Sequence, residues 1–265
     1  MTTDTALRSR RDVVRTMLNK VPEVTLFFWV IKILATTVGE TAADYLNETL
    51  GFGLTWTTVV MTVATVALLV AQFRTRAYVA PVYWAVVVFI SVVGTLITDN
   101  LTDRFGVPLP LSTAVFAVLL AGTFALWYRS ERTLSIHSIV TTRRESWYWL
   151  AILFTFALGT AAGDLVGEQF SLGYGVSVLL FAAAIALVTI AHLGFKANAV
   201  LSFWLAYILT RPLGASVGDL MSQSHRHGGL GLGTTGTSVL FLGAILVLVG
   251  YLTVTRVDRT QVETA

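Results

Sequence analysis

Apolar residues run along this chain in eight stretches of about twenty, separated by short polar segments. The stretches lie near 24–47, 54–73, 80–102, 110–128, 147–167, 174–194, 200–221 and 234–255. A helix of that length crosses the ~30 Å hydrocarbon core of a bilayer, because each residue adds ~1.5 Å. The pattern predicts an all-α integral membrane bundle of eight transmembrane helices, with no room for a separate soluble domain.

Every second stretch carries the same frame of residues. A glycine follows a tryptophan by ten residues and an aspartate follows it by fifteen. The four sets are Trp29, Gly39 and Asp44; Trp84, Gly94 and Asp99; Trp149, Gly159 and Asp164; and Trp204, Gly214 and Asp219. The chain therefore consists of four helical-hairpin repeats. Because all four start on the same side of the membrane, they are parallel repeats, and equal offsets from the tryptophan predict equal depth.

The tryptophan spacing also divides the chain into two halves. Trp29 and Trp84 are 55 residues apart, as are Trp149 and Trp204, whereas the middle interval is 65. The extra ten residues fall in a basic segment between the halves. The expected organisation is a cytoplasmic N-terminal tail (1–20), repeats 1 and 2 (21–128), a basic cytoplasmic linker (129–146), repeats 3 and 4 (147–255) and a cytoplasmic tail (256–265).

The charges report on topology. The sequence is 55% hydrophobic and 12% charged, and fourteen of its eighteen Lys and Arg flank the predicted spans on one side. Arg104 and Arg226 fall on the other side, and Lys32 and Arg211 lie within spans. The positive-inside rule places both termini of a multi-pass membrane protein in the cytoplasm. The basic excess therefore does not indicate nucleic-acid binding. The chain has no cysteine, which excludes disulfides and thiolate metal sites.

Acidic residues form two layers near the outer side. The four repeated aspartates define the deeper layer, and an outer acidic tier follows four residues later, made of Glu48, Asp103 and Glu168. Parallel helices with acids on one face would form an electronegative funnel, and rings of carboxylates select cations. Close carboxylates also share protons, which could couple proton to substrate movement. In the alternative interpretation, the aspartates only hold the outer turns.

Three charged residues break the repeat and lie deeper. Lys32, Glu40 and Arg211 each have uncharged counterparts in the other repeats; Thr95 and Thr160 share the depth of Glu40. We expect Arg211 and Glu40 to form an ion pair near the midplane, since each would cost at least ~2.5–3.5 kcal/mol unpaired. Pro212 predicts a helix break beside them. The three charges indicate either a binding or gating site or a structural ion-pair network.

The glycines ten residues after each tryptophan, here called the glycine layer, are expected to serve helix packing. The residues four positions later are also small in every repeat, namely Ala43, Thr98, Gly163 and Gly218. Small residues spaced by four let helix backbones approach closely, so this layer predicts the central packing seam.

Other chemistry is sparse. His225 and His227, in a glycine-rich outer loop, are weak candidates for capturing a metal ion, with a plain surface loop as the alternative. No nucleotide-binding loop, catalytic triad or zinc-protease helix is present. We therefore expect no cofactor, no catalytic residues and no enzymatic activity.

Two stretches carry a family resemblance. Residues 20–25 leading to Trp29 and Gly39-Glu40, and residues 210–219 from Thr210-Arg211-Pro212, are similar to bacterial membrane proteins built of four tandem two-helix repeats, each with a tryptophan and of unknown function. The resemblance covers about 20–255 and implies the architecture but no activity.

The residues favour a secondary transporter of a small cation, a divalent metal ion being one candidate, with proton coupling. Asp44, Asp99, Asp164 and Asp219 would bind it, Glu40 would exchange the charge, and Lys32 and Arg211 would be counter-ions. A second hypothesis is transport of a small organic solute or weak acid recognised by Arg211 and Lys32. A third is a non-transporting scaffold or sensor whose partner docks on the basic 129–146 linker. The expected partners are the lipid bilayer and a small cation or polar solute, without nucleic acid; the sequence is compatible with a monomer or a dimer.

Overall fold

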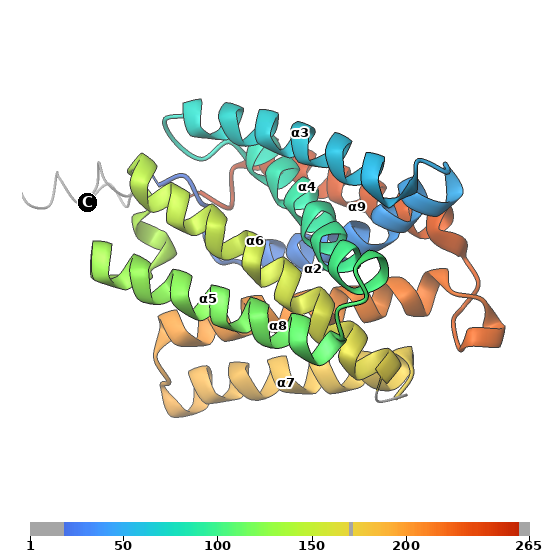
Figure 1. Ribbon diagram of the computed structural model, residues 1–265. Coiled ribbons are helices and arrows are strands. Elements are labelled where there is room, and N and C mark those ends of the chain that lie inside the picture. The colour runs from blue at the N-terminus through green and yellow to red at the C-terminus, as the bar shows by residue number, and fades with distance from the viewer. Residues whose placement is uncertain (1–18, 170–171, 260–265) are drawn as a thin grey trace, which may run out of the picture.

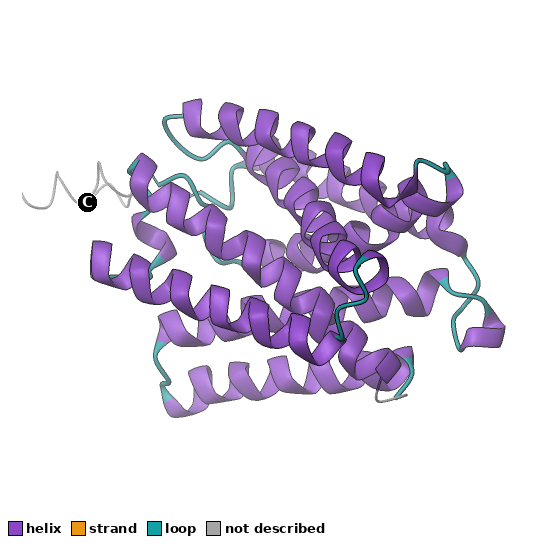
Figure 2. Cartoon of the chain, viewed as in Figure 1, coloured by secondary structure: helices purple, strands orange, loops and turns teal. Residues whose placement is uncertain are grey.

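The computed structural model describes residues 19–169 and 172–259, and these residues form helices joined by short loops, with no strand among them (Figure 2). Eight helices are long and apolar enough to cross a membrane. The fold class expected from the sequence is confirmed: an all-α bundle of helical hairpins.

The first helix of each repeat belongs to an inner ring. The inner helices are α2 (Leu26–Asp44), α4 (Ala80–Asp99), α6 (Thr142–Asp164) and α8 (Ala199–Ser222). Each packs against the next, and α8 returns to pack against α2, so the ring closes within one chain. Half or more of the span window of each inner helix is buried inside the protein.

The second helix of each repeat lies outside this ring. The outer helices are α3 (Gly53–Arg74), α5 (Leu109–Glu131), α7 (Tyr174–Phe195) and α9 (Gly233–Thr255). Helices α3, α5 and α7 pack mainly on the next inner helix along the chain, and α9 packs on α2. Figure 1 shows α2 in the middle of the bundle, with α3 and α7 on opposite outer sides. The outer helices expose apolar side chains such as Val63 and Leu187, as a lipid-facing surface requires.

The two ends of the bundle differ. At one end, here called the termini end, residues 19–25, the loops before α4, α6 and α8, and residues 256–259 come together (Figure 1). The backbone nitrogen of Glu23 donates to the carbonyl of Asp258, and that of Lys20 donates to Ile139. The opposite end, here called the acidic end, carries the turns that follow the repeated aspartates. Three of these turns are π-helical: η1 (Tyr45–Thr49), η2 (Asn100–Arg104) and η4 (Leu165–Gln169).

Two expected boundaries are corrected by the structure. Helix α6 begins at Thr142, five residues earlier than the apolar run, because the Thr141 hydroxyl caps it by accepting from Arg144 N, and Glu145 occupies its first turn. The linker between the halves therefore ends at Thr141, and holds a short 3₁₀ helix, η3 (Ile136–Ser138). The N-terminal tail expected for residues 1–20 lies largely outside the described residues, but Asn19 and Lys20 are buried parts of the bundle.

Candidate functional site

The glycine layer is the seam of the inner ring. Gly39 lies against Ser91 of the next repeat, Gly94 against Phe156, Gly159 against Arg211, and Gly214 against Thr36 of the first repeat. In every pair, the partner is the residue seven after the tryptophan of the following repeat. A methyl group on any of these glycines would overlap that partner. The predicted packing seam is confirmed, and it fixes the same register at all four inner contacts.

Arg211 occupies the centre of the ring at the depth of Glu40. Its side chain is fully buried, and its Nη2 lies 2.8 Å from Glu40 Oε2 and 2.7 Å from Thr160 Oγ1. The same nitrogen donates to the Thr95 hydroxyl, and Nη1 donates to the carbonyl of Thr36 at 3.3 Å. The predicted ion pair is confirmed. One guanidinium from α8 thus joins α2, α4 and α6.

The Arg211 side chain takes the place of a polar residue that the fourth repeat lacks at the depth of Glu40. The residues eleven after each tryptophan are Glu40, Thr95, Thr160 and Ala215. The fourth repeat has an apolar alanine there, and Arg211, one turn earlier in the same helix, reaches to the other three. The sequence places the two threonines at this depth, but it does not identify them as partners of the arginine.

The helix break predicted at Pro212 is wrong. Helix α8 continues from Ala199 to Ser222 through the proline. Gly159 and Gly163 of α6 lie against its ring and backbone, so the bulky proline fits into the seam and needs no break in the helix. Membrane helices tolerate a proline when neighbouring helices support the altered backbone.

Lys32 lies closer to the termini end and is fully buried. Its Nζ lies 4.0 Å from the ring centre of Phe156 and 4.2 Å from that of Tyr207. Among the described residues, no hydrogen-bond acceptor reaches this nitrogen. The amine is therefore packed between two aromatic faces, which is the geometry of a cation–π contact, and not against a carboxylate.

The acids above Glu40 form a gradient of exposure. Glu48 and Asp103, in the outer tier, are exposed, and the repeated aspartates are half-buried. The Glu40 side chain keeps 10% of its exposure, whereas Arg211 keeps none. Access to water therefore narrows from the acidic end down to Glu40 and stops at Arg211.

Several of these carboxylates lie close enough to interact. Asp99 lies in electrostatic range of Glu40, Asp44, Asp164 and Asp103. Asp44 lies in range of Glu40, Glu48 and Asp103, and also of Arg211. Asp219 is half-buried at the same depth of α8, near its end. The side chain of Glu168, the third member of the predicted outer tier, lies outside the described residues.

The structure does not assemble a metal cluster from these groups. Among the side chains that the structure describes, which do not include those of Glu168 and His227, no three His, Cys, Asp or Glu are placed to hold one metal ion. The aspartates come from four different helices around the ring, and the Glu40 carboxylate is already bound to Arg211. The four aspartates Asp44, Asp99, Asp164 and Asp219 are thus not gathered into one cluster of ligands, and metal binding by them stays a prediction.

The histidines have structural roles where the structure describes them. His225 Nδ1 lies 3.0 Å from the carbonyl of Gly229 inside the outer loop, which contains the 3₁₀ helix η5 (His225–His227). The side chain of His227 lies outside the described residues, so the weak histidine metal site stays a prediction. His192 Nδ1 lies 3.0 Å from the carbonyl of Ala197 and closes the end of α7.

The termini end of the ring is filled by aromatic rings. The repeated tryptophans take part: Trp84 packs against Phe28 and Tyr83, and Trp149 against Tyr83 and Tyr148. The hydroxyls of Tyr83 and Tyr148 lie 2.5 Å apart. All of these rings are at most 4% exposed. In this arrangement the axis is closed toward the termini end.

An ion-pair network holds the loops beyond this aromatic layer. Lys20 Nζ lies 2.6 Å from the fully buried carboxylate of Glu145 and 3.1 Å from the carbonyl of Phe73. Gln72 donates to the other carboxylate oxygen at 3.1 Å. Arg143 and Arg144, in the first turn of α6, both pair with Glu131 at the end of α5, at 2.8 and 2.7 Å.

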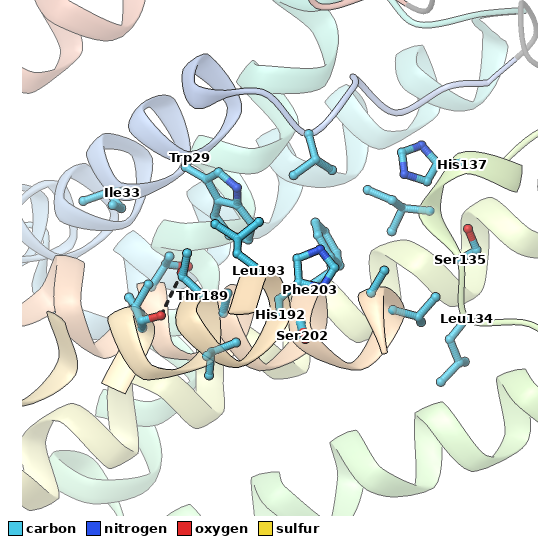
Figure 3. A pocket seen from close by; sticks show the side chains of 18 residues that line it. Trp29, Ile33, Leu134, Ser135, His137, Thr189, His192, Leu193, Ser202 and Phe203 are labelled. Carbon is cyan, nitrogen blue, oxygen red and sulfur yellow. Dashed lines mark hydrogen bonds between the residues drawn. The ribbon is translucent and has the colours of Figure 1, made fainter. Parts of the chain in front are cut away.

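A pocket of about 510 Å³ lies among α2, α7, α8 and the segment around Leu134 to His137 (Figure 3). Trp29 and Ile33 of α2 form one wall, and Thr189 and Leu193 of α7 form another (Figure 3). None of the charged residues singled out from the sequence lines it. Its lining is mainly apolar, and the charged residues of the axial site are not part of it.

A family model matches four successive segments of the chain, residues 27–78, 82–133, 147–198 and 202–258. Its description is Repeat of Unknown Function (DUF347). The chain belongs to this family. No curated protein and no solved structure matches it. The expected resemblance is thereby confirmed, and each matched segment contains one inner and one outer helix of the ring.

Against the background of the family repeat, the axial charges are departures from symmetry. The four repeats supply the seam glycines and the aspartate layer equally, whereas the charges on the axis come only from the first and fourth repeats, as Lys32, Glu40 and Arg211. The site therefore lies where α2 meets α8, at the closure of the ring. Sequence reasoning missed Phe156 and Tyr207 as neighbours of Lys32, since an apolar ring at the right depth gives no separate signal.

Proposed function

We propose that this protein is a secondary transporter that moves a small cation across the membrane in exchange for protons. The observation that carries the proposal is the Glu40–Arg211 pair, which closes the axis of a four-helix ring beneath a layer of interacting carboxylates. Acids that converge on a closed axis are arranged to attract cations. The described residues hold no three-ligand cluster, so the proposal is for a small cation bound by one or two carboxylates.

The pair also supplies a coupling step. A cation that enters from the acidic end meets Asp44 and Asp99 first and then competes with Arg211 for Glu40. Because Arg211 joins α8 to α2, α4 and α6, loss of its bond to Glu40 would loosen the ring at its closure. A ligand shifts a conformational equilibrium only through different affinities for the two states, and competition for one carboxylate provides that difference. A proton on Glu40 would weaken the pair in the same way, which is the basis for exchange.

The proposal includes an orientation. The excess of Lys and Arg at the termini end places that end in the cytoplasm of a bacterial inner membrane, and the acidic end outside. The arrangement described here, accessible down to Glu40 and closed by aromatic rings below Lys32, would then be the outward-facing state. Alternating access would require a second state in which the aromatic layer opens.

A small organic acid remains the second candidate, on one observation. Both Lys32 Nζ and Arg211 Nε lack a hydrogen-bond acceptor among the described residues. A carboxylate substrate could occupy them, but it would have to pass the acidic layer first, which disfavours anions. A scaffold or sensor role has less support, because Arg143 and Arg144, which the sequence assigned to the linker, lie at the start of α6 and are already paired with Glu131.

The test is flux in proteoliposomes with a pH dye inside. The panel consists of Na⁺, K⁺ and Li⁺, with Mg²⁺ and Mn²⁺ as divalent arms and acetate and lactate as anion arms. We expect a cation to enter with opposite proton movement, and Asp99→Asn to reduce this flux strongly. The matched control is Glu131→Gln, which removes a carboxylate at the opposite end of the bundle and should leave flux unchanged. Flux of an anion alone, or no flux with folded protein, would overturn the cation proposal.

A further inference from the structure

Lys32 has no evident structural purpose. A buried lysine that serves packing or an ion pair is expected to meet a carboxylate or several carbonyls, because an uncompensated charge in the membrane is costly. Lys32 instead faces two aromatic rings, and Arg211 lies near enough to repel its charge. Such a group can be accommodated when its amine exists without the proton for part of a cycle, since a neutral amine is far cheaper to bury than an ammonium.

A row of tyrosine side chains leads from Lys32 to the termini end, with one direct contact between hydroxyls in it. Tyr207, whose ring faces Lys32, lies in electrostatic range of Tyr148, and its hydroxyl makes no hydrogen bond among the described residues. The hydroxyls of Tyr148 and Tyr83 are 2.5 Å apart, and the ring of Tyr83 meets that of Tyr78 edge-on at 5.6 Å.

The row ends on a carboxylate. Tyr78 donates to Asp258 Oδ2 at 2.5 Å. Asp258 lies beyond the last span, in the C-terminal segment at the termini end. It therefore gives the row an acidic group at the same end as the chain termini.

The same region holds buried polar atoms without protein partners. Trp84 Nε1, Trp149 Nε1 and Ser91 Oγ make no hydrogen bond among the described residues. Buried polar groups of this kind are normally satisfied by ordered water. Water beside these atoms would bridge the steps between hydroxyls that are not in direct contact.

We propose that Lys32 carries protons between the Glu40–Arg211 site and this row of tyrosines, which delivers them to Asp258. The inference rests on the proposed function, since it names the route of the exchanged proton. In each cycle the neutral Lys32 amine accepts a proton from one side and becomes an ammonium, then gives a proton to the other side and becomes neutral again. Each tyrosine hydroxyl accepts one proton and gives another, so no tyrosine changes its charge overall. Asp258, at the far end of the row, takes the proton up and releases it toward the termini end.

The experiment separates proton movement from cation movement. The cation that wild type moves fastest in the panel above is used in two assays. In counterflow, a labelled cation exchanges for the same unlabelled cation and no net proton is needed. In net flux, cation entry is measured together with the internal pH dye. The variants are Tyr83→Phe, which removes one hydroxyl and keeps the ring, and Lys32→Met, with Tyr251→Phe on the outer helix α9 as the control.

The expected result is selective. Tyr83→Phe and Lys32→Met should lower proton-coupled net flux about tenfold or more, the scale at which a positioned proton-transfer group acts. Counterflow should stay within about twofold of wild type in Tyr83→Phe, and Tyr251→Phe should match wild type in both assays. Tyr83→Phe keeps the inference open to refutation even where Lys32→Met disturbs folding.

Two results would overturn the inference in different ways. If wild type shows counterflow and Tyr83→Phe moves protons at the wild-type rate, the tyrosine route is wrong while the proposed function stands. If no cation shows counterflow with folded wild type, the proposed function fails, and the route fails with it.

Discussion

Arg211 Nη2 lies 2.8 Å from Glu40 Oε2, and it shares its remaining contacts with hydroxyls from the two other inner helices. The last repeat is thereby joined to all three others through one guanidinium. The seam between Gly214 and Thr36 closes the ring at the same level by packing. The closure therefore depends on one electrostatic and one steric contact, and these can be tested separately.

The electrostatic contact predicts strong coupling in stability. Removing one member of a buried ion pair leaves an uncompensated charge and typically costs about 3–5 kcal/mol. We expect Arg211→Met and Glu40→Gln each to lower the free energy of unfolding by about 3 kcal/mol. The double variant should lose clearly less than the sum, since neither charge is left behind. Unfolding in mixed micelles with increasing SDS measures all four proteins.

An exposed cation provides the control for that cycle. Arg104 at the acidic end donates to the Thr55 hydroxyl from an exposed position. Arg104→Gln should change stability by no more than about 0.5 kcal/mol. Additive losses in the Glu40–Arg211 double variant would show that the two side chains act independently and would contradict the arrangement.

The depth of each side chain could be read from the sequence, but its direction could not. The tryptophan frame places Arg211 one turn from Glu40, and the structure confirms that pairing. Lys32 has the same kind of signal, yet its neighbours Phe156 and Tyr207 depend on how α6 and α8 rotate about their axes. That rotation is set by the seam glycines through steric contact. The helix break expected at Pro212 is wrong for the same reason, because the glycines that pack against this proline belong to another helix.

The seam predicts that a single methyl group is harmful at one glycine and harmless at another. A Cβ on Gly94 would lie 2.5 Å from the Cβ of Phe156 and 3.2 Å from the backbone nitrogen of Ala157. Overpacking of this kind costs about 1–3 kcal/mol. Gly94→Ala should therefore be destabilising in thermal unfolding in detergent.

The control for Gly94→Ala is a substitution at a glycine on an outer helix. Gly122 in α5 has no atom near the position of an added Cβ. Gly122→Ala should be neutral or stabilise the protein by up to about 1 kcal/mol, since alanine favours the helix. Equal effects of the two substitutions would contradict the assigned seam.

At the termini end, the buried ion pair of Lys20 and Glu145 should contribute more to the free energy of unfolding than the exposed pair of Arg143 and Glu131. Lys20 is the cation that pairs with the fully buried Glu145, so Lys20→Met should destabilise the protein by about 3 kcal/mol or more. Arg143→Ala removes a side chain that is 64% exposed and should cost under about 1 kcal/mol. Thermal unfolding measures the stability of both variants, and limited proteolysis near residue 20 reports whether Lys20→Met loosens the segment before α2. A larger effect of Arg143→Ala would contradict the burial order.

A pH dependence follows from the contact between Tyr78 and Asp258. Burial raises the pKa of the Asp258 carboxyl above its usual 3.8, although the Tyr78 hydroxyl partly offsets this. Burial also raises the pKa of Tyr78, so this hydroxyl remains a protonated donor throughout the accessible range. A carboxyl with a higher pKa in the folded protein binds its proton more tightly when folded. The stability it contributes is complete below about pH 4 and is lost as the pH rises through the folded-state pKa.

Asp258→Asn should remove this loss. The asparagine keeps an acceptor for Tyr78 but carries no ionising group, so the variant should gain stability relative to wild type as the pH rises above about 4. The gain should level off once the wild-type carboxyl is fully ionised. Thermal unfolding in detergent from pH 4 to pH 8 measures it, with Tyr78→Phe as a companion that removes the donor and should steepen the wild-type loss. A difference that shrinks with rising pH would show that the carboxyl is stabilised by ionisation and would reverse the assignment.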